Sequence, residues 1–202
     1  KDPAISFFMK HKIVKKKEKT IALNFANIGN RILGGDIEVL RGMAIELVEK
    51  LIRDEWTIFL YPTTSNDLSF MLSDLGFAKY NNLKLYTDYL DHIKSIEFLS
   101  QMDVFLGQRL HAVIFASCAS TPFHSIVYQP KTIDYLKSIN MYNERYYSST
   151  DSLNVKLIYQ KLNYIYENLD QEQEFLFSNM NEAYEEQQQT LSLLKRTIIN
   201  EN

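Results

Sequence analysis

The chain has 202 residues, of which 46% are hydrophobic and 23% are charged, and its net charge is −3. A chain of this size and balance builds a large core without disulfides or metals, and its charge argues against a sequence-wide attraction to nucleic acid. The single cysteine, Cys118, excludes an internal disulfide, which fits a reducing cytosol. Since no stretch approaches the ~18–20 apolar residues that span a bilayer, we expect a cytoplasmic protein, at most peripheral at the inner face of the membrane.

Residues 1–19 are predicted to be a linker or interdomain segment. The chain opens KDPA, without a methionine or the architecture of a signal peptide, so we expect it to be a fragment of a longer protein. Residues 10–19 (KHKIVKKKEK) are basic. Two interpretations of this run stay open, a solvated linker and a surface patch for an anionic lipid or polymer.

The first half of the folded part alternates apolar strands with amphipathic helices. Residues 20–25 (TIALNF) predict a buried strand. Asp36 is placed to cap a helix that ends near Arg53, because apolar residues recur there at spacings of three and four. Residues 57–61 (TIFLY) predict a second strand, and residues 67–75 a helix with Gly76 at its C-cap.

The same alternation continues to the end of the chain. We expect strands at residues 83–86, 103–106 and 123–128, and helices at residues 90–101, 108–117 and 132–139. Beyond Ser152, apolar residues at helical spacing predict two final helices.

This order of elements predicts the fold class. Strands that alternate with helices through short connections are typical of an α/β, Rossmann-like parallel sheet with helices on both faces. We assign residues 20–150 to this domain and residues 151–202 to a helical extension that packs on it or on a missing N-terminal domain. Ligands of such sheets bind beyond the carboxyl ends of the strands, so the loops to search are residues 25–36, 62–66, 87–89, 107–111 and 128–131.

One of these loops carries the residues with the clearest chemistry. Gly107 allows a sharp turn at the end of a strand, and the helix that follows offers unpaired N–H groups to an anion. Arg109 adds a planar fork for phosphate or carboxylate, and His111 can donate to an anion or move a proton. The alternative interpretation is an arginine paired with a nearby carboxylate and a packed histidine.

The surrounding sequence resembles a known family. Residues 103–116 (DVFLGQRLHAVIFA), followed by Thr121-Pro122 and Tyr128-Gln-Pro-Lys131, are similar to the "RLHA…FA…P…Y.PK" run in the C-terminal domain of polysaccharide pyruvyl transferases. The opening Asp2-Pro3-Ala4 is similar to the "DPA" segment that leads into that domain. The good agreement covers residues 88–140, with weaker agreement over residues 1–60.

The resemblance implies a fold like the C-terminal half of a GT-B-type two-domain transferase and a function in exopolysaccharide or cell-wall biosynthesis in bacteria. Family members move a pyruvyl group from phosphoenolpyruvate to a sugar of a cell-surface polysaccharide, and no further cofactor is implied. Arg109 and His111 would hold the donor's carboxylate and phosphate, with His111 also a candidate general acid. Leu110 would contribute backbone and packing, and Lys131 would line the same crevice or simply be a solvated lysine at a helix start.

The sequence departs from the family pattern after the first strand. Family members often carry an arginine there, where this chain has Asn24, Phe25 and Ala26. We place Asn24 and Arg31 among the candidate substrate-binding residues, with Arg31 as a substitute for the missing arginine. An anion site without that arginine lacks a charge-assisted hydrogen bond of ~1.5–3 kcal/mol.

Three functions remain open: a pyruvyl transferase, a GT-B-type glycosyltransferase that uses a nucleotide sugar, and a non-catalytic relative that acts as a binding or scaffold domain. The expected partners are phosphoenolpyruvate, a saccharide or lipid-linked glycan acceptor, the missing N-terminal domain and, through an apolar patch left exposed, a second copy in a homodimer. The chain alone is expected to be folded but inactive. His124 is expected to be a core or cleft histidine and His92 an exposed residue at a helix start.

Overall fold

The computed structural model describes residues 2–9, 17–27 and 36–200, with side chains up to residue 195. A six-stranded sheet, in the order β3-β2-β1-β4-β5-β6 and parallel throughout, forms its centre. This is the strand order of Rossmann-like nucleotide-binding sheets, so the predicted fold class is confirmed. The strands are β1 (Thr20–Asn24), β2 (Thr57–Leu60), β3 (Lys84–Leu85), β4 (Val104–Gly107), β5 (Phe123–Val127) and β6 (Tyr147–Ser149).

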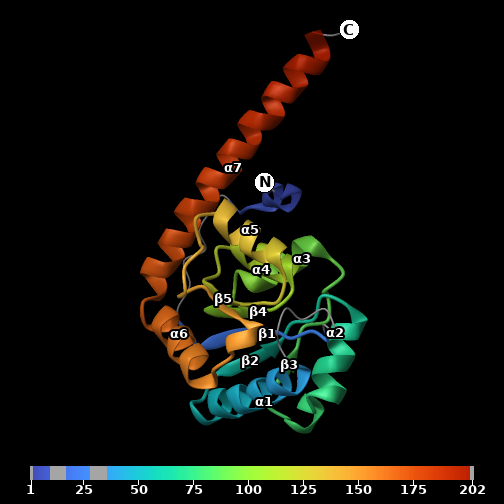
Figure 1. Ribbon diagram of the computed structural model, residues 1–202, viewed down its shortest axis with the longest axis vertical. Helices are drawn as coiled ribbons and strands as arrows, with labels where there is room; N and C mark the ends of the chain where they lie inside the picture. The colour runs from blue at the N-terminus through green and yellow to red at the C-terminus, as the bar shows by residue number, and fades with distance from the viewer. Residues whose placement is uncertain (1, 10–16, 28–35, 201–202) are drawn as a thin grey trace.

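Helices cover both faces of the sheet (Figure 1). The α-helices are α1 (Ile37–Arg53), α2 (Ser65–Ser69), α3 (His92–Leu99), α4 (Leu110–Cys118), α5 (Pro130–Ser138), α6 (Val155–Glu167) and α7 (Leu169–Asn200). Shorter turns are η1 (Pro3–Phe7), η3 (Phe70–Asp74), η4 (Phe77–Lys79) and η5 (Thr150–Ser152). Helices α1 and α6 share one hydrophobic core with the sheet, and α3, α4 and α5 share the other.

The central strands are buried on both faces, which explains their nearly continuous apolar sequences. All residues of β1, β4 and β5 are buried. Along β1, Ile21 and Leu23 belong to the core beneath α1, and Ala22 belongs to the core beneath α4. Successive side chains of a strand point to opposite faces, so a strand between two layers of helices must be apolar at every position.

Most predicted elements occur within a few residues of their expected bounds. Asp36 caps α1 by accepting a hydrogen bond from the Glu38 N–H at 2.8 Å, and Gly76 adopts a left-handed φ of 67°. The helix predicted at residues 67–75 begins two residues earlier, after the capping residue Thr64, and widens into the π-helical turn η3.

Strand β6 was not predicted. Its three residues are half-buried and polar or aromatic, because it lies at the edge of the sheet. Such a short edge strand lacks the apolar run that marks the inner strands, so only its pairing with β5 identifies it.

The first described residues pack onto the body of the protein rather than extending from it. Ile5 is fully buried, and the Phe8 ring lies 5.3 Å from that of Phe177 in α7. The Gln187 side chain donates to the Asp2 carbonyl oxygen at 3.0 Å. Helix α7 then projects away from the sheet (Figure 1). Within the described residues, no helix combines the length and apolar character needed to cross a membrane.

Candidate active site

A pocket of about 890 Å³ lies at the carboxyl ends of β2, β3, β4 and β5. Its walls come from η1, from the loops that follow these strands and from the first turns of the helices after them. Four of the five loops that the sequence predicted to bind ligands contribute residues, namely 62–66, 87–89, 107–111 and 128–131. The lining residues that carry polar or charged groups include Asp2, Thr63, Asn66, His92, Arg109, His111, Tyr128 and Lys131. Segments far apart in the sequence therefore meet at this edge of the sheet, as parallel α/β topology requires.

Gly107 shapes the loop that leads into the pocket. It is the last residue of β4, and a Cβ added there would lie only 2.3 Å from the Phe105 ring atom Cε1 and 3.1 Å from the Val113 side chain. This requirement for glycine differs from the sharp turn that the sequence predicted. Glycine is needed because two buried side chains approach the backbone closely.

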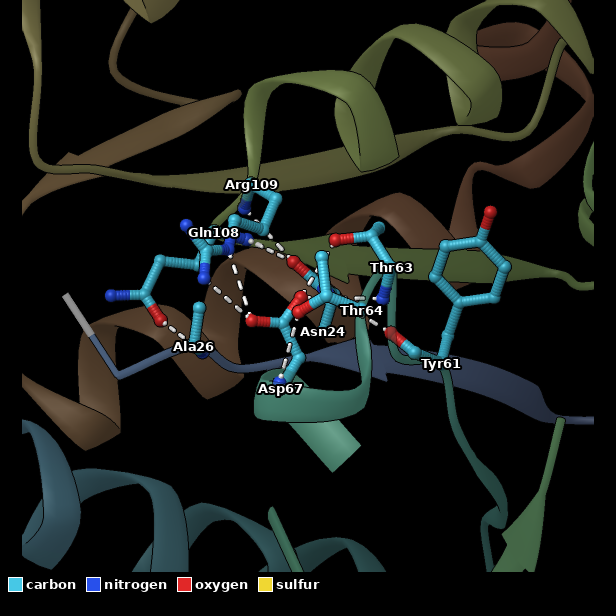
Figure 2. A network of polar contacts seen from close by, with 8 residues as sticks. All are labelled: Asn24, Ala26, Tyr61, Thr63, Thr64, Asp67, Gln108 and Arg109. Carbon is cyan, nitrogen blue, oxygen red and sulfur yellow. Dashed lines mark hydrogen bonds and ion pairs between the residues drawn. The ribbon is translucent and has the colours of Figure 1, made fainter. Parts of the chain in front are cut away.

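Asn24 and Gln108 tie this loop to β1 and β2 (Figure 2). The Asn24 side chain donates to the Tyr61 carbonyl oxygen at 2.9 Å and accepts from the backbone N–H groups of Gln108 and Arg109 at 3.3 and 2.9 Å. Gln108 Oε1 accepts from the Ala26 N–H at 2.8 Å. Both side chains are fully buried, so they position the backbone behind the pocket and do not line it.

Arg109 extends from this clamped backbone to a buried carboxylate. Its Nε and Nη2 donate to Asp67 Oδ1 at 3.1 and 2.7 Å, while 29% of the Arg109 side chain remains exposed and Asp67 has no exposed surface (Figure 2). Burial alone lowers the pKa of Arg109, but the hydrogen bonds and charge of Asp67, with a smaller contribution from Tyr128, raise it above its ordinary value. The cation is therefore permanent, and both interpretations of Arg109 hold together: it is paired with a carboxylate and it lines the pocket.

Leu110 and His111 form the first turn of α4. Both line the pocket; Leu110 is half-buried and His111 is exposed. The His111 ring lies 6.4 Å from the ring of Phe115, measured between centroids. The histidine is thus placed at the pocket surface, where its imidazole can meet a ligand.

A second histidine lies on the same wall. His92, the first residue of α3, is exposed as expected and lies 5.2 Å from Phe115 between ring centroids, on the pocket lining. The sequence pattern did not select it as a site residue. Its place three residues after the predicted loop 87–89 was the available signal. Thr63 and Asn66 also line the pocket, and both lie inside the predicted range 62–66.

Tyr128, Gln129 and Lys131 supply the pocket wall at the end of β5. Lys131 is exposed, so it is a solvated lysine near the start of α5 and a pocket residue at once. Arg31, the other predicted cation, lies outside the described residues. The structure therefore brings Arg109, Leu110, His111 and Lys131 together and places Asn24 behind them.

His124 belongs to the core and not to the pocket. Its Nδ1 donates to the Arg145 carbonyl oxygen at 2.7 Å and its Nε2 lies 2.9 Å from the Ser148 hydroxyl. Burial lowers the pKa of His124 to about 3, so the ring is neutral and Ser148 is the donor to Nε2. The expectation of a satisfied core histidine is confirmed.

The fold and the pocket define the class of protein: a parallel α/β domain with a polar pocket, lined in part by Arg109 and Lys131, at the carboxyl ends of its strands. Residues 2–130 match the family model described as polysaccharide pyruvyl transferase. The chain belongs to the polysaccharide pyruvyl transferase family, and the resemblance seen in the sequence is confirmed.

Among solved structures, the chain is similar to one titled "Crystal Structure Analysis of the Glycotransferase of kitacinnamycin", with 14% sequence identity and a TM-score of 0.46. The similarity covers 85% of this chain and 43% of that chain, so this chain spans less than half of the matched protein. No curated protein matches the chain.

Proposed function

We propose that this chain is the donor-binding part of a polysaccharide pyruvyl transferase, and that the pocket takes phosphoenolpyruvate. The observation that carries the proposal is the meeting of Arg109, His111 and Lys131 on one pocket from two different strand-to-helix loops. A donor with a carboxylate and a phosphate presents two anionic groups, which suit a guanidinium fork and a second cation. Membership of the family supports the same reaction class.

The chemistry requires one proton and two sugar hydroxyls. A general acid protonates C3 of phosphoenolpyruvate, C2 becomes electrophilic, and a sugar hydroxyl attacks it. Phosphate then leaves C2 with its bonding electrons, and a second hydroxyl of the same sugar attacks to close the pyruvate ketal. One hydroxyl proton replaces the proton given by the acid, and the other leaves with phosphate, so the acid is restored.

The residues of this chain have separate roles in that scheme. Arg109 binds one anionic group of the donor through the guanidinium edge that Asp67 does not use. His111, exposed at the pocket surface, is the candidate acid because imidazole exchanges protons near neutral pH. Lys131 stabilises the phosphate as it leaves. The proposed reaction uses no cofactor, because phosphoenolpyruvate is a substrate that is consumed.

The acceptor is proposed to be a saccharide or a lipid-linked glycan. It would bind across the pocket from an N-terminal domain not contained in this chain, in the cytoplasm or at the inner face of the membrane. The chain alone is then expected to bind the donor without turning it over. A homodimer through exposed apolar residues of α7, such as Leu193 and Leu194, remains a separate proposal.

Calorimetry with phosphoenolpyruvate tests the proposal on the chain and on Arg109→Ala. Saturable binding by the wild type is expected, with binding roughly 100-fold weaker but still measurable in Arg109→Ala, while Arg53→Ala, which removes an exposed arginine at the end of α1, should bind as the wild type does. A nucleotide sugar titrated in parallel decides the glycosyltransferase alternative. Absence of phosphoenolpyruvate binding both here and in the full-length protein would contradict the transferase assignment.

One observation favours the non-catalytic alternative. Arg109 already has a full negative charge beside it, so the net charge of the pair available to a ligand is smaller than that of a lone arginine. Binding of a saccharide with no binding of phosphoenolpyruvate by the full-length protein would make that alternative the better account.

A further inference from the structure

Asp67 has hydrogen-bond partners at both carboxylate oxygens and at its backbone N–H, although the sequence did not predict it as a site residue. Its Oδ1 accepts both Arg109 hydrogen bonds, and its Oδ2 accepts from the Thr63 hydroxyl at 2.6 Å and from the Thr63 N–H at 3.2 Å (Figure 2). Its own N–H donates to Thr64 Oγ1 at 3.2 Å, as expected in the first turn of α2. The carboxylate therefore has a fixed position and no exposed surface.

The two hydrogen bonds to Arg109 select one edge of the guanidinium. Nε and Nη2 form the side edge of the group, and both donate to the same oxygen. The end edge, formed by Nη1 and the second hydrogen of Nη2, is not used by Asp67. Because the backbone N–H of Arg109 is bound by Asn24 as well, the side chain is held at its base and at its tip.

The charge of Asp67 serves this contact and not its local loop. The contacts at Oδ2 come from Thr63, which directly precedes the N-cap of α2 and lies four residues before Asp67. A neutral acceptor of the same shape can accept those two hydrogen bonds. The contact with Arg109 joins the first turn of α2 to the loop after β4, and the negative charge of a carboxylate strengthens its hydrogen bonds to a guanidinium.

We propose that Asp67 is a positioning residue, which holds Arg109 so that the end edge of its guanidinium, not used by Asp67, is presented to an anionic ligand in the pocket. This inference rests on the proposed function in that the ligand is taken to be the carboxylate or phosphate of phosphoenolpyruvate. A long arginine side chain is otherwise free to sample many rotamers, and ordering it at the moment of binding weakens affinity. Asp67 orders it beforehand and in one direction, which suits a ligand with two adjacent anionic oxygens.

A double-mutant cycle tests this role, with phosphoenolpyruvate as the probe. Asp67→Asn keeps the shape of the side chain, removes its charge and replaces one of its two acceptor oxygens by an NH2 donor, so we expect a loss of affinity of roughly 10- to 100-fold. The control Asp74→Asn makes the same change at an exposed position in η3 and should have no effect. In an Arg109→Ala background, Asp67→Asn should cause no further loss, because it acts through Arg109.

A measurement without ligand separates positioning from folding. The Arg109 Nε–H signal in nitrogen-15 NMR, identified by its disappearance in Arg109→Ala, should exchange slowly in the wild type and at least about tenfold faster in Asp67→Asn. Circular dichroism and thermal melting establish that each variant is folded. A folded Asp67→Asn that binds as the wild type does, or whose effect adds to that of Arg109→Ala, would overturn the positioning role.

The outcomes also separate this inference from the proposed function. If the wild type binds inorganic phosphate but not phosphoenolpyruvate, the donor assignment fails, and the same cycle measured with inorganic phosphate decides the role of Asp67. If the wild-type chain and the full-length protein bind neither anion, both proposals fall, whatever the NMR signal does.

Discussion

Two arginine–carboxylate pairs with similar N···O distances lie in different parts of this domain. Arg109 donates to Asp67 at 2.7 Å beside the pocket, and Arg145 donates to Glu172 at 2.8 Å between the sheet edge and α7. In each pair the carboxylate is almost fully buried and the arginine is partly exposed.

The pairs differ in what surrounds them. Arg145 lies over the rings of Tyr146 and Tyr164, 5.8 and 4.6 Å from their centroids, and Tyr146 donates to the second oxygen of Glu172. The carbonyl oxygen of Arg145 accepts from His124. Arg145 and Glu172 thus make their hydrogen bonds and ring contacts with other protein groups. These contacts join β5, the segment before β6 and α7.

The comparison teaches that residue type alone does not mark a site. Each region has an arginine, a buried carboxylate and a histidine, but His124 is buried with both ring nitrogens in contact, whereas His111 lies exposed on a pocket. What distinguishes the functional candidate is its place at the carboxyl ends of the central strands, where a ligand has access.

The largest expected effect comes from removing the cation at the pocket. Arg109→Ala leaves the carboxylate of Asp67 buried without its cation, so we expect a loss of about 3 kcal/mol in the free energy of unfolding. Urea denaturation measures it. Adding Asp67→Asn should recover part of the stability, since the buried charge is then gone; a double variant less stable than Arg109→Ala would contradict this account.

Arg145→Ala is the matched change at the structural pair. Because Glu172 keeps the Tyr146 hydrogen bond and Arg145 is 42% exposed, we expect a smaller loss, about 2 kcal/mol. Affinity for phosphoenolpyruvate, measured by calorimetry on the folded variant, should stay within about twofold of the wild type. A large loss of affinity in this variant would remove the contrast between the two pairs.

The buried histidine predicts a dependence of stability on pH. The pKa of His124 is about 3 in the folded protein and about 6.5 when unfolded, so between these values the unfolded state binds the extra proton. The contribution of His124 to the free energy of unfolding is therefore fully present above the pKa of the unfolded state. As the pH falls from that value toward the pKa of the folded state, the free energy of unfolding decreases by up to about 1.4 kcal/mol per pH unit. Denaturation at several pH values should show a shallower slope in His124→Gln, and the same slope as the wild type in His92→Gln.

The smallest effect is expected at the exposed lysine of the pocket. Lys131→Ala should weaken phosphoenolpyruvate binding by about two- to fivefold, because an exposed charge contributes little in water. Lys156→Ala, which removes an exposed lysine from α6, is the control. Equal losses in both variants would indicate a general effect of net charge, and no loss in either would exclude Lys131 from the site.

Much of the fold follows from local patterns. Apolar runs such as residues 20–24 and 104–106, together with the cap at Asp36 and the glycine at Gly76, predict strands and helices because burial and backbone geometry act locally. The edge strand β6 escaped prediction since its side chains are only half-buried. The chemistry of Arg109 and His111 was visible because both lie in one short loop.

The sequence by itself determined the family, the parallel α/β class and the loop that carries Arg109, Leu110 and His111. Only the tertiary structure decided which residues meet that loop. Asp67 and Asn24 precede Arg109 by 42 and 85 positions, and no spacing rule connects them. Their contacts arise because parallel strands place their carboxyl ends at one edge of the sheet, where loops from distant parts of the chain pack together and bury a carboxylate beside an arginine.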